Sequence, residues 1–198
     1  DPIKLSIPTF EFTADLRLGT DSLSTIQAIT TAAKALLSDD DRARISDRND
    51  RLAKSSRAWV KAAEKAALEH SATVPIDRLW ASYQIGQMLD DNCVVLDETL
   101  PPNQTRVYFD RSVPGSYFAN PGSSGGWATG AALGAKLAAP ERDIVAVSGD
   151  GFYMFGTPAP ALWAAAHHDA PFLQIVYTNR SYTTGTERIM ANYGAESF

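Results

Sequence analysis

Residues 144–151 read Ile144-Val145-Ala146-Val147-Ser148-Gly149-Asp150-Gly151, and this stretch decides the fold. Its first half is continuously apolar, as expected for a strand of a parallel sheet that is buried on both faces. The strand stops at a Gly-Asp-Gly sequence, which we expect to form a turn at its carboxyl end. Ligands of open α/β sheets bind at that edge, where Gly149 and Gly151 allow close backbone approach and Asp150 supplies a carboxylate oxygen.

The segments on either side of this strand alternate between helix and strand. The expected helices cover 76–89, 126–137 and a stretch from Pro158 or Pro160 to about His168, and the expected strands cover 93–96, 144–147 and 172–178. Such alternation predicts an α/β fold in which helices cover both faces of a parallel sheet.

A second polar residue, Asn179, follows the expected strand 172–178. One right-handed crossover would join the two strands, so the side chains of Asp150 and Asn179 can reach the same edge of the sheet. Magnesium prefers oxygen ligands and completes its octahedron with phosphate oxygens and water. Asp150, the Asn179 amide oxygen and the backbone carbonyl of Ser181 therefore form a candidate metal–phosphate site.

The composition indicates a soluble globular protein. The chain has 198 residues, 44% of them hydrophobic, and a formal net charge of −5, so it offers no basic stripe for nucleic acid. No apolar run approaches the roughly 18 residues that a membrane-spanning helix needs. The single cysteine, Cys93, and the missing signal peptide favour the cytoplasm.

Three zones of the chain differ in composition. Residues 1–37 are expected to be the tail of a preceding domain, 38–73 a helical linker, and 74–198 the domain that carries the candidate site. Ser38-Asp39-Asp40-Asp41 suits a helix N-cap with acidic residues in the first turn. The start without methionine and the short segment after Asn179 lead us to expect a fragment whose α/β domain is incomplete at its C-terminus.

Two segments resemble the signature of thiamine-diphosphate-dependent enzymes. Gly149-Asp150-Gly151, together with Tyr177-Thr178-Asn179-Arg180-Ser181-Tyr182, is similar to the Gly-Asp-Gly and the Asn-ended strand of acetolactate synthases, pyruvate oxidases and benzoylformate decarboxylases. The likeness covers about Val74 to Tyr182, and residues 1–37 are similar to the end of the family's middle domain. The resemblance implies the thiamine-diphosphate-binding fold, with 74–198 as the domain that binds diphosphate and magnesium.

The resemblance also implies roles for individual residues. Asp150, Asn179 and the Ser181 carbonyl would hold Mg²⁺, and the Ser123 carbonyl would hold the exocyclic amine of the cofactor. The other residues implied to bind the cofactor are Glu98, Thr99, Gly125, Gly149, Gly151, Phe152 and Tyr182.

This sequence departs from the family pattern in two places. Relatives carry a bulky apolar residue where our alignment puts Gly125, so either Trp127 takes that place or the alignment is shifted. The spacing from Asp150 to Asn179 is also slightly long, and Gly156-Thr157-Pro158 is the expected insertion.

The implied reaction breaks or forms a carbon–carbon bond next to a carbonyl of a small-molecule substrate, as in a 2-oxo acid decarboxylase (a lyase) or an acetolactate synthase-like transferase. The activating glutamate is expected on a separate, absent domain, so no catalytic residue is assigned and this chain alone is expected to be inactive. A homodimer or homotetramer is expected for the full-length enzyme. FAD is a possible further cofactor of the full-length enzyme, but no residue of this sequence indicates it.

Two alternatives stay open. One is another nucleotide-binding α/β enzyme such as an NAD-dependent dehydrogenase, although its G-x-G-x-x-G fingerprint is absent from the sequence. The other is a non-catalytic domain that shares the fold, because a fold does not determine a function.

Overall fold

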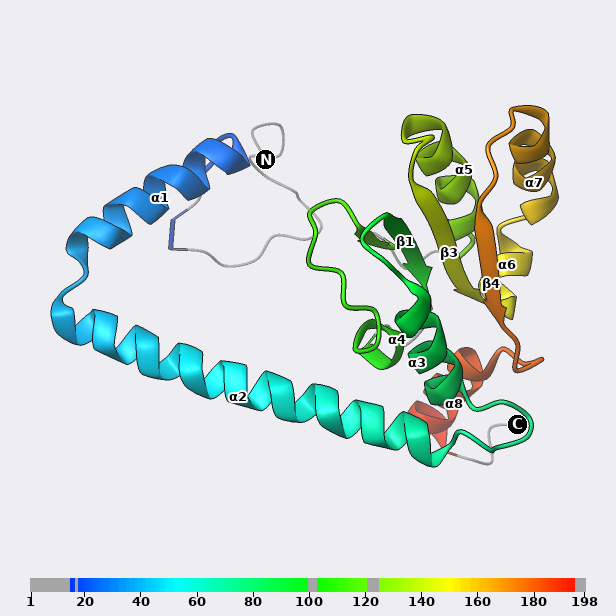
Figure 1. Ribbon diagram of the computed structural model, residues 1–198, viewed down its shortest axis with the longest axis horizontal. Helices are drawn as coiled ribbons and strands as arrows, with labels where there is room; N and C mark the ends of the chain where they lie inside the picture. Colours follow the sequence, from blue (N-terminus) through cyan, green and yellow to red (C-terminus); the bar gives the residue numbers. More distant parts are fainter. Residues whose placement is uncertain (1–14, 17, 100–102, 121–124, 195–198) are drawn as a thin grey trace. The chain divides into compact units, whose positions relative to one another are not determined.

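The computed structural model describes residues 15–16, 18–99, 103–120 and 125–194 (Figure 1). The chain divides into two compact units, residues 1–57 and 58–198, and the division falls inside the long helix α2 (Asp39–Glu69). The zone boundaries expected after residues 37 and 73 stay predictions.

Two helices precede the α/β part, and local capping explains where each begins. In α1 (Ser22–Leu36) the Asp21 side chain accepts a hydrogen bond from the Ser24 amide at 2.9 Å. Before α2, Ser38 and Asp41 cap each other: the Asp41 amide donates to Ser38 Oγ at 3.2 Å, and the Ser38 amide donates to Asp41 Oδ2 at 3.1 Å. The expected N-cap at residues 38–41 is confirmed.

In the part of the chain that the structure describes, four parallel strands form one sheet in the order β2-β1-β3-β4. Their bounds are Cys93–Glu98 for β1, Tyr117–Ala119 for β2, Asp143–Gly149 for β3 and Leu173–Tyr177 for β4. Glu98 pairs with Ser148, and Gly149 pairs with Tyr177. The carboxyl ends of β1, β3 and β4 therefore meet at one edge, as the sequence predicts.

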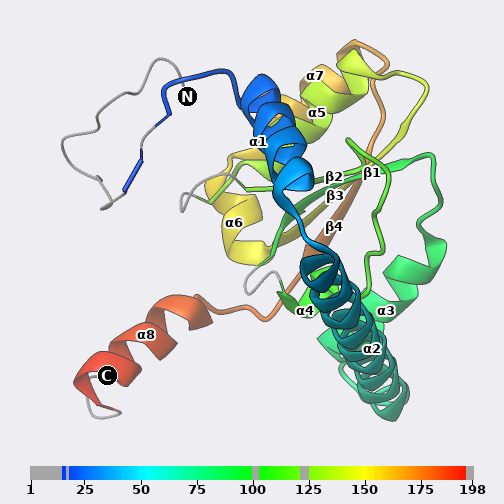
Figure 2. The same ribbon diagram turned by 90° about the vertical axis from the view of Figure 1, so that its left-hand side faces the viewer.

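Helices cover both faces of this sheet (Figure 2). On one face, alternate residues of β1 and β3 pack against α5 (Ala128–Ala138), and α7 (Pro158–His167) contacts α5. On the other face, Val95, Val145 and Val147 pack with Phe109 and with Ile85 of α3 (Arg78–Met88). The predicted α/β fold is confirmed.

Several short elements were not predicted. They are β2 and the helices α4 (Asn103–Arg106), α6 (Asp150–Phe155) and α8 (Thr183–Tyr193). The turn expected at Gly-Asp-Gly is wrong, because Gly149 is the N-cap of α6 and the helix begins at Asp150. Among the described residues, no helix combines the length and the apolar content that crossing a bilayer requires.

Candidate functional site

The Asp150 carboxylate connects the end of β3 with the loop that follows β4. Its Oδ1 accepts a hydrogen bond from the Gly151 amide at 2.8 Å, and its Oδ2 accepts one from the Arg180 amide at 2.8 Å. The second bond spans 30 positions of sequence and places the backbone of Arg180 directly against the carboxylate. Each carboxylate oxygen retains capacity for a further partner.

Asn179 and Ser181 flank the residue that is bonded to Asp150. The Ser181 amide donates to Asn179 Oδ1 at 2.9 Å, and Asn179 Nδ2 donates to Thr183 Oγ1 at 3.1 Å. Arg180 lies between them in the left-handed region, with φ 57°. The structure thus brings the three predicted metal-binding residues together at the edge of the sheet.

A metal ion can also be held by a group of acidic, histidine and cysteine side chains. In the ranges that the structure describes, no group of three or more His, Cys, Asp or Glu side chains could hold a metal ion. A cation at this edge would therefore depend on amide and backbone oxygens as well as on Asp150.

The glycines around Asp150 differ in their surroundings. A Cβ built on Gly149 would meet no atom within 4 Å, so one side of this residue is open. A Cβ on Gly151 would lie 3.0 Å from Cε1 of Tyr182, whose ring stands over the glycine. The predicted residues Gly149 and Gly151 therefore flank Asp150 in the chain, and Tyr182 packs against Gly151.

Phe152 fills the space where Gly125 lacks a side chain. A Cβ on Gly125 would lie 2.2 Å from Cδ1 of the Phe152 ring. Trp127 instead packs against the core cluster between α5 and the sheet. The sequence suggested two explanations for Gly125, a bulky side chain supplied by Trp127 or a shifted alignment. Neither of them predicted the contact between Gly125 and Phe152. Ser123 lies outside the described residues.

Glu98 is the last residue of β1, and its buried carboxylate binds the start of α5. Oε1 accepts from Asn120 Nδ2 at 2.7 Å and from the Trp127 amide at 2.8 Å. Oε2 accepts from the Ala128 amide at 2.9 Å. This carboxylate, which was predicted to bind the cofactor, thus accepts hydrogen bonds from donors of the chain itself.

Asp97 is a second buried carboxylate, and the sequence did not predict the hydrogen bonds that it makes within the chain. It accepts hydrogen bonds from the Thr99 amide and hydroxyl at 2.9 and 2.7 Å, from the Thr105 hydroxyl at 3.0 Å and from the Tyr117 hydroxyl at 2.8 Å. The hydroxyl of Thr99, a predicted cofactor contact, is therefore held within this network. Burial, and then the negative charge of Asp97, raise the pKa of Tyr117. An acidic residue directly after the apolar run of β1 is the sequence signal that could have indicated this network.

Buried polar bonds also join the strands below the edge. Thr129 Oγ1 donates to Gln174 Oε1 at 2.9 Å, and Gln174 Nε2 donates to Ser148 Oγ at 3.1 Å. They connect α5 to β4 and β4 to β3, the two strands that precede Asp150 and Asn179 in the chain.

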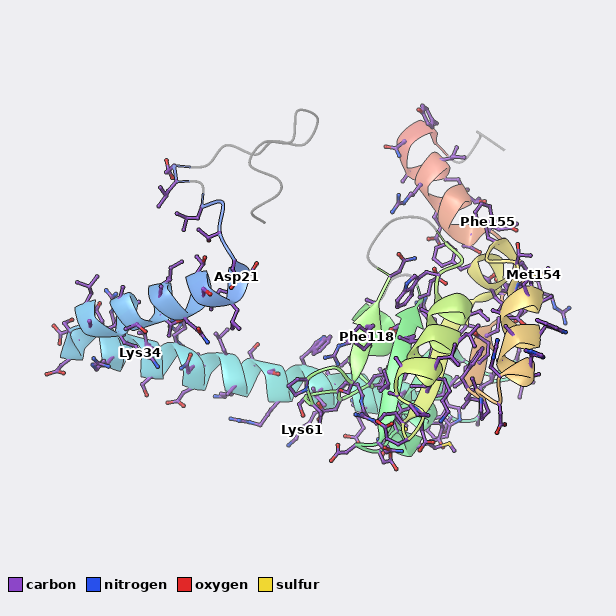
Figure 3. All side chains as sticks on the ribbon, turned by 90° about the horizontal axis from the view of Figure 1, so that it is seen from above. Asp21, Lys34, Lys61, Phe118, Met154 and Phe155 are labelled. Carbon is purple, nitrogen blue, oxygen red and sulfur yellow. The ribbon has the colours of Figure 1, made fainter. Side chains whose placement is uncertain are left out.

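Large apolar side chains project from α6 and β2 (Figure 3). Met154 and Phe155 of α6 are 65% and 72% exposed, and Phe118 of β2 is 47% exposed. The short helix that begins with Asp150 thus presents an apolar surface to solvent.

Comparisons with known proteins show which sequences and folds this chain is similar to. Residues 103–197 match the family described as thiamine pyrophosphate enzyme, C-terminal TPP binding domain. The chain is similar to benzoylformate decarboxylase of Pseudomonas aeruginosa, with 39% identity over 69 residues that make up 35% of this chain and 13% of that protein.

Two solved structures share the fold. Benzoylformate decarboxylase from Polynucleobacter necessarius matches with a TM-score of 0.54 and 16% identity, over 62% of this chain and 24% of the other. The thiamine diphosphate-dependent 4-hydroxybenzoylformate decarboxylase of Rhodococcus jostii RHA1 matches with a TM-score of 0.53 and 24% identity, over 65% of this chain and 24% of the other.

The chain thus spans about a quarter or less of the length of these relatives. The comparisons do not favour the dehydrogenase alternative. Over residues 103–197, the chain therefore matches the C-terminal cofactor-binding domain of the thiamine-diphosphate-dependent enzyme superfamily.

Proposed function

We propose that this chain is the magnesium- and diphosphate-binding part of a thiamine-diphosphate-dependent 2-oxo acid decarboxylase. The observation that carries the proposal is the 2.8 Å hydrogen bond from the Arg180 amide to Asp150 Oδ2. Because this bond holds residues 179–181 beside the carboxylate, it supports a single site made of Asp150, the Asn179 amide oxygen and the Ser181 carbonyl.

The chemistry of this donor set fits Mg²⁺, which takes hard oxygen ligands and fills its remaining positions with phosphate oxygens and water. Backbone amides already orient Asp150 and Asn179 Oδ1, so little side-chain freedom would be lost when a cation binds. The open side of Gly149 and the ring of Tyr182 over Gly151 support a diphosphate position next to the metal. Phe152, Gly125, Thr99 and Ser123 complete the proposed surroundings of the cofactor.

When bound, thiamine diphosphate would supply a carbanion that adds to a carbonyl and a thiazolium ring that accepts the electrons of the broken carbon–carbon bond. The residues of this chain would bind and orient it through its diphosphate. The relatives' names, benzoylformate and 4-hydroxybenzoylformate decarboxylase, support a 2-oxo acid substrate and a lyase reaction rather than acetolactate synthesis.

The activating glutamate is proposed to come from another domain, so the chain alone should not turn over. A cytoplasmic homodimer or homotetramer is the proposed form of the whole enzyme.

Thermal unfolding of the full 198-residue chain tests the proposal. Thiamine diphosphate with MgCl₂ should raise the melting temperature, whereas thiamine diphosphate with EDTA, or NAD, should not. Asp150→Asn should remove the response. Asp143→Asn, at the opposite end of the same strand, should retain it. An Asp150→Asn protein that responds like wild type would show that the metal assignment is wrong.

A further inference from the structure

The start of α5 is held by a residue far from it in sequence. Trp127 occupies the N-cap position of α5 and makes no capping hydrogen bond with its side chain. The first amides of a helix have no acceptor inside the helix and need one from elsewhere. Glu98 supplies it at the end of β1, because its carboxylate accepts from the Trp127 and Ala128 amides at 2.8 and 2.9 Å.

The backbone just before α5 is fixed on its other side by α6. Gly125 packs against the Phe152 ring, and Gly126 packs against the backbone of Gly156. Gly126 has φ 100°, so its backbone is committed to a conformation that other residues rarely adopt. The segment 125–128 is therefore held between the carboxylate of Glu98 and the helix that begins with Asp150.

We propose that Glu98 is a positioning residue of the cofactor site, acting through the start of α5 rather than by touching the cofactor. This proposal rests on the proposed function. The carboxylate is only 2% exposed and already accepts three hydrogen bonds, which leaves no open side for a diphosphate. A negative diphosphate beside a negative carboxylate would also be repelled. Loss of Glu98 would release segment 125–128 and, through Phe152 and Gly156, loosen α6.

Amide hydrogen exchange of the full chain tests the positioning role without any cofactor. In Glu98→Ala, the Trp127 and Ala128 amides should exchange at least about tenfold faster than in wild type, because they lose charge-assisted bonds. Glu98→Gln keeps one acceptor oxygen, so its exchange rates at these two amides should lie between those of wild type and of Glu98→Ala. Asp97→Asn is the matched control, because Asp97 is 3% exposed on the same strand but bonds hydroxyl groups and the Thr99 amide instead of α5. Unchanged exchange at Trp127 and Ala128 in Glu98→Ala would overturn the proposal.

Binding of thiamine diphosphate with MgCl₂ at a temperature where every variant is folded gives the second readout. Glu98→Gln should weaken binding by about tenfold, equivalent to the loss of one charge-assisted hydrogen bond. If its amides loosen while its affinity equals that of wild type, Glu98 is structural only and the proposal fails. If its affinity falls while its amides stay protected, Glu98 touches the cofactor directly and the proposal also fails. If wild type itself does not bind, the proposed function fails, whereas the exchange experiment still decides whether Glu98 holds α5.

Discussion

Gly126 and Gly156 lie in direct backbone contact. A Cβ built on Gly126 would lie 2.5 Å from Cα of Gly156, and one built on Gly156 would lie 2.6 Å from the Gly126 carbonyl oxygen. Real Cβ atoms do not approach this closely, so each position requires glycine for steric reasons, and Gly126 requires it also for its φ of 100°. This contact joins the segment before α5 to the end of α6.

Gly126→Ala should therefore destabilise the protein by about 3 kcal/mol or more, since it combines overpacking with an unfavourable φ. Urea unfolding followed by circular dichroism measures the change. Gly130→Ala is the matched control: Gly130 lies inside α5, and a Cβ there would meet nothing within 4 Å. That variant should be more stable by about 1 kcal/mol, because alanine is the better helix former. Equal effects at the two positions would contradict the contact.

Arg180 adopts a left-handed backbone conformation, with φ 57°, so that its amide can reach Asp150. Arg180→Gly should raise stability by about 0.5–1 kcal/mol, because glycine adopts this conformation without strain and keeps the amide. Arg180→Ala removes the same guanidinium but retains a Cβ, so it should give no such gain. The difference between the two urea midpoints isolates the backbone effect, and identical midpoints would count against it.

The sheet was predictable because β1, β3 and β4 each contain an apolar run, and these runs alternate with helical segments along the chain. Helix α6 was not predictable, because two glycines beside one aspartate read locally as a turn. Its first residue is fixed by Arg180, which lies 30 positions away in sequence. Strand β2 has only three residues and exists through its pairing with β1.

The pairing of Asp150 with the loop after β4 could be predicted from topology, since parallel strands share an edge. The part played by Glu98 could not, because its partners are backbone amides that no sequence pattern identifies. The sequence offers one indirect signal. The N-cap position of α5 is occupied by Trp127, which is not one of the residue types that usually cap a helix.

Tyr177, the last residue of β4, should make stability depend on alkaline pH. Its hydroxyl lies 2.8 Å from Ser82 Oγ, and burial raises the pKa of Tyr177 from 10 to about 12. The folded state thus favours the neutral phenol, so this contribution is complete below pH 10 and is lost as pH rises toward 12. Tyr177→Phe should cost about 1 kcal/mol at neutral pH, for the lost hydrogen bond.

Unfolding free energies of wild type and Tyr177→Phe, measured between pH 8 and about pH 12, should therefore converge above pH 10. Tyr193→Phe serves as the control, because Tyr193 is 79% exposed. That variant should follow the wild-type curve throughout. Parallel curves for wild type and Tyr177→Phe would show that the Tyr177 hydroxyl does not titrate with a raised pKa.

Substitutions at and beside Asn179 can show whether its side chain binds the metal or only stabilises the turn. Asn179→Ala removes the amide oxygen proposed to bind Mg²⁺, so the magnesium-dependent response to thiamine diphosphate should disappear. Thr183→Val removes only the hydroxyl that accepts from Asn179 Nδ2 at 3.1 Å, and it leaves Oδ1 bonded to the Ser181 amide. Its affinity should therefore stay within about threefold of wild type, a change of less than 1 kcal/mol. Calorimetric titration at fixed thiamine diphosphate and varied MgCl₂ distinguishes the two variants. If both variants lose affinity equally, Asn179 acts by shaping the turn. Only a metal-ligand role predicts that losing the Asn179 amide oxygen weakens binding more than losing the hydrogen bond made by Asn179 Nδ2.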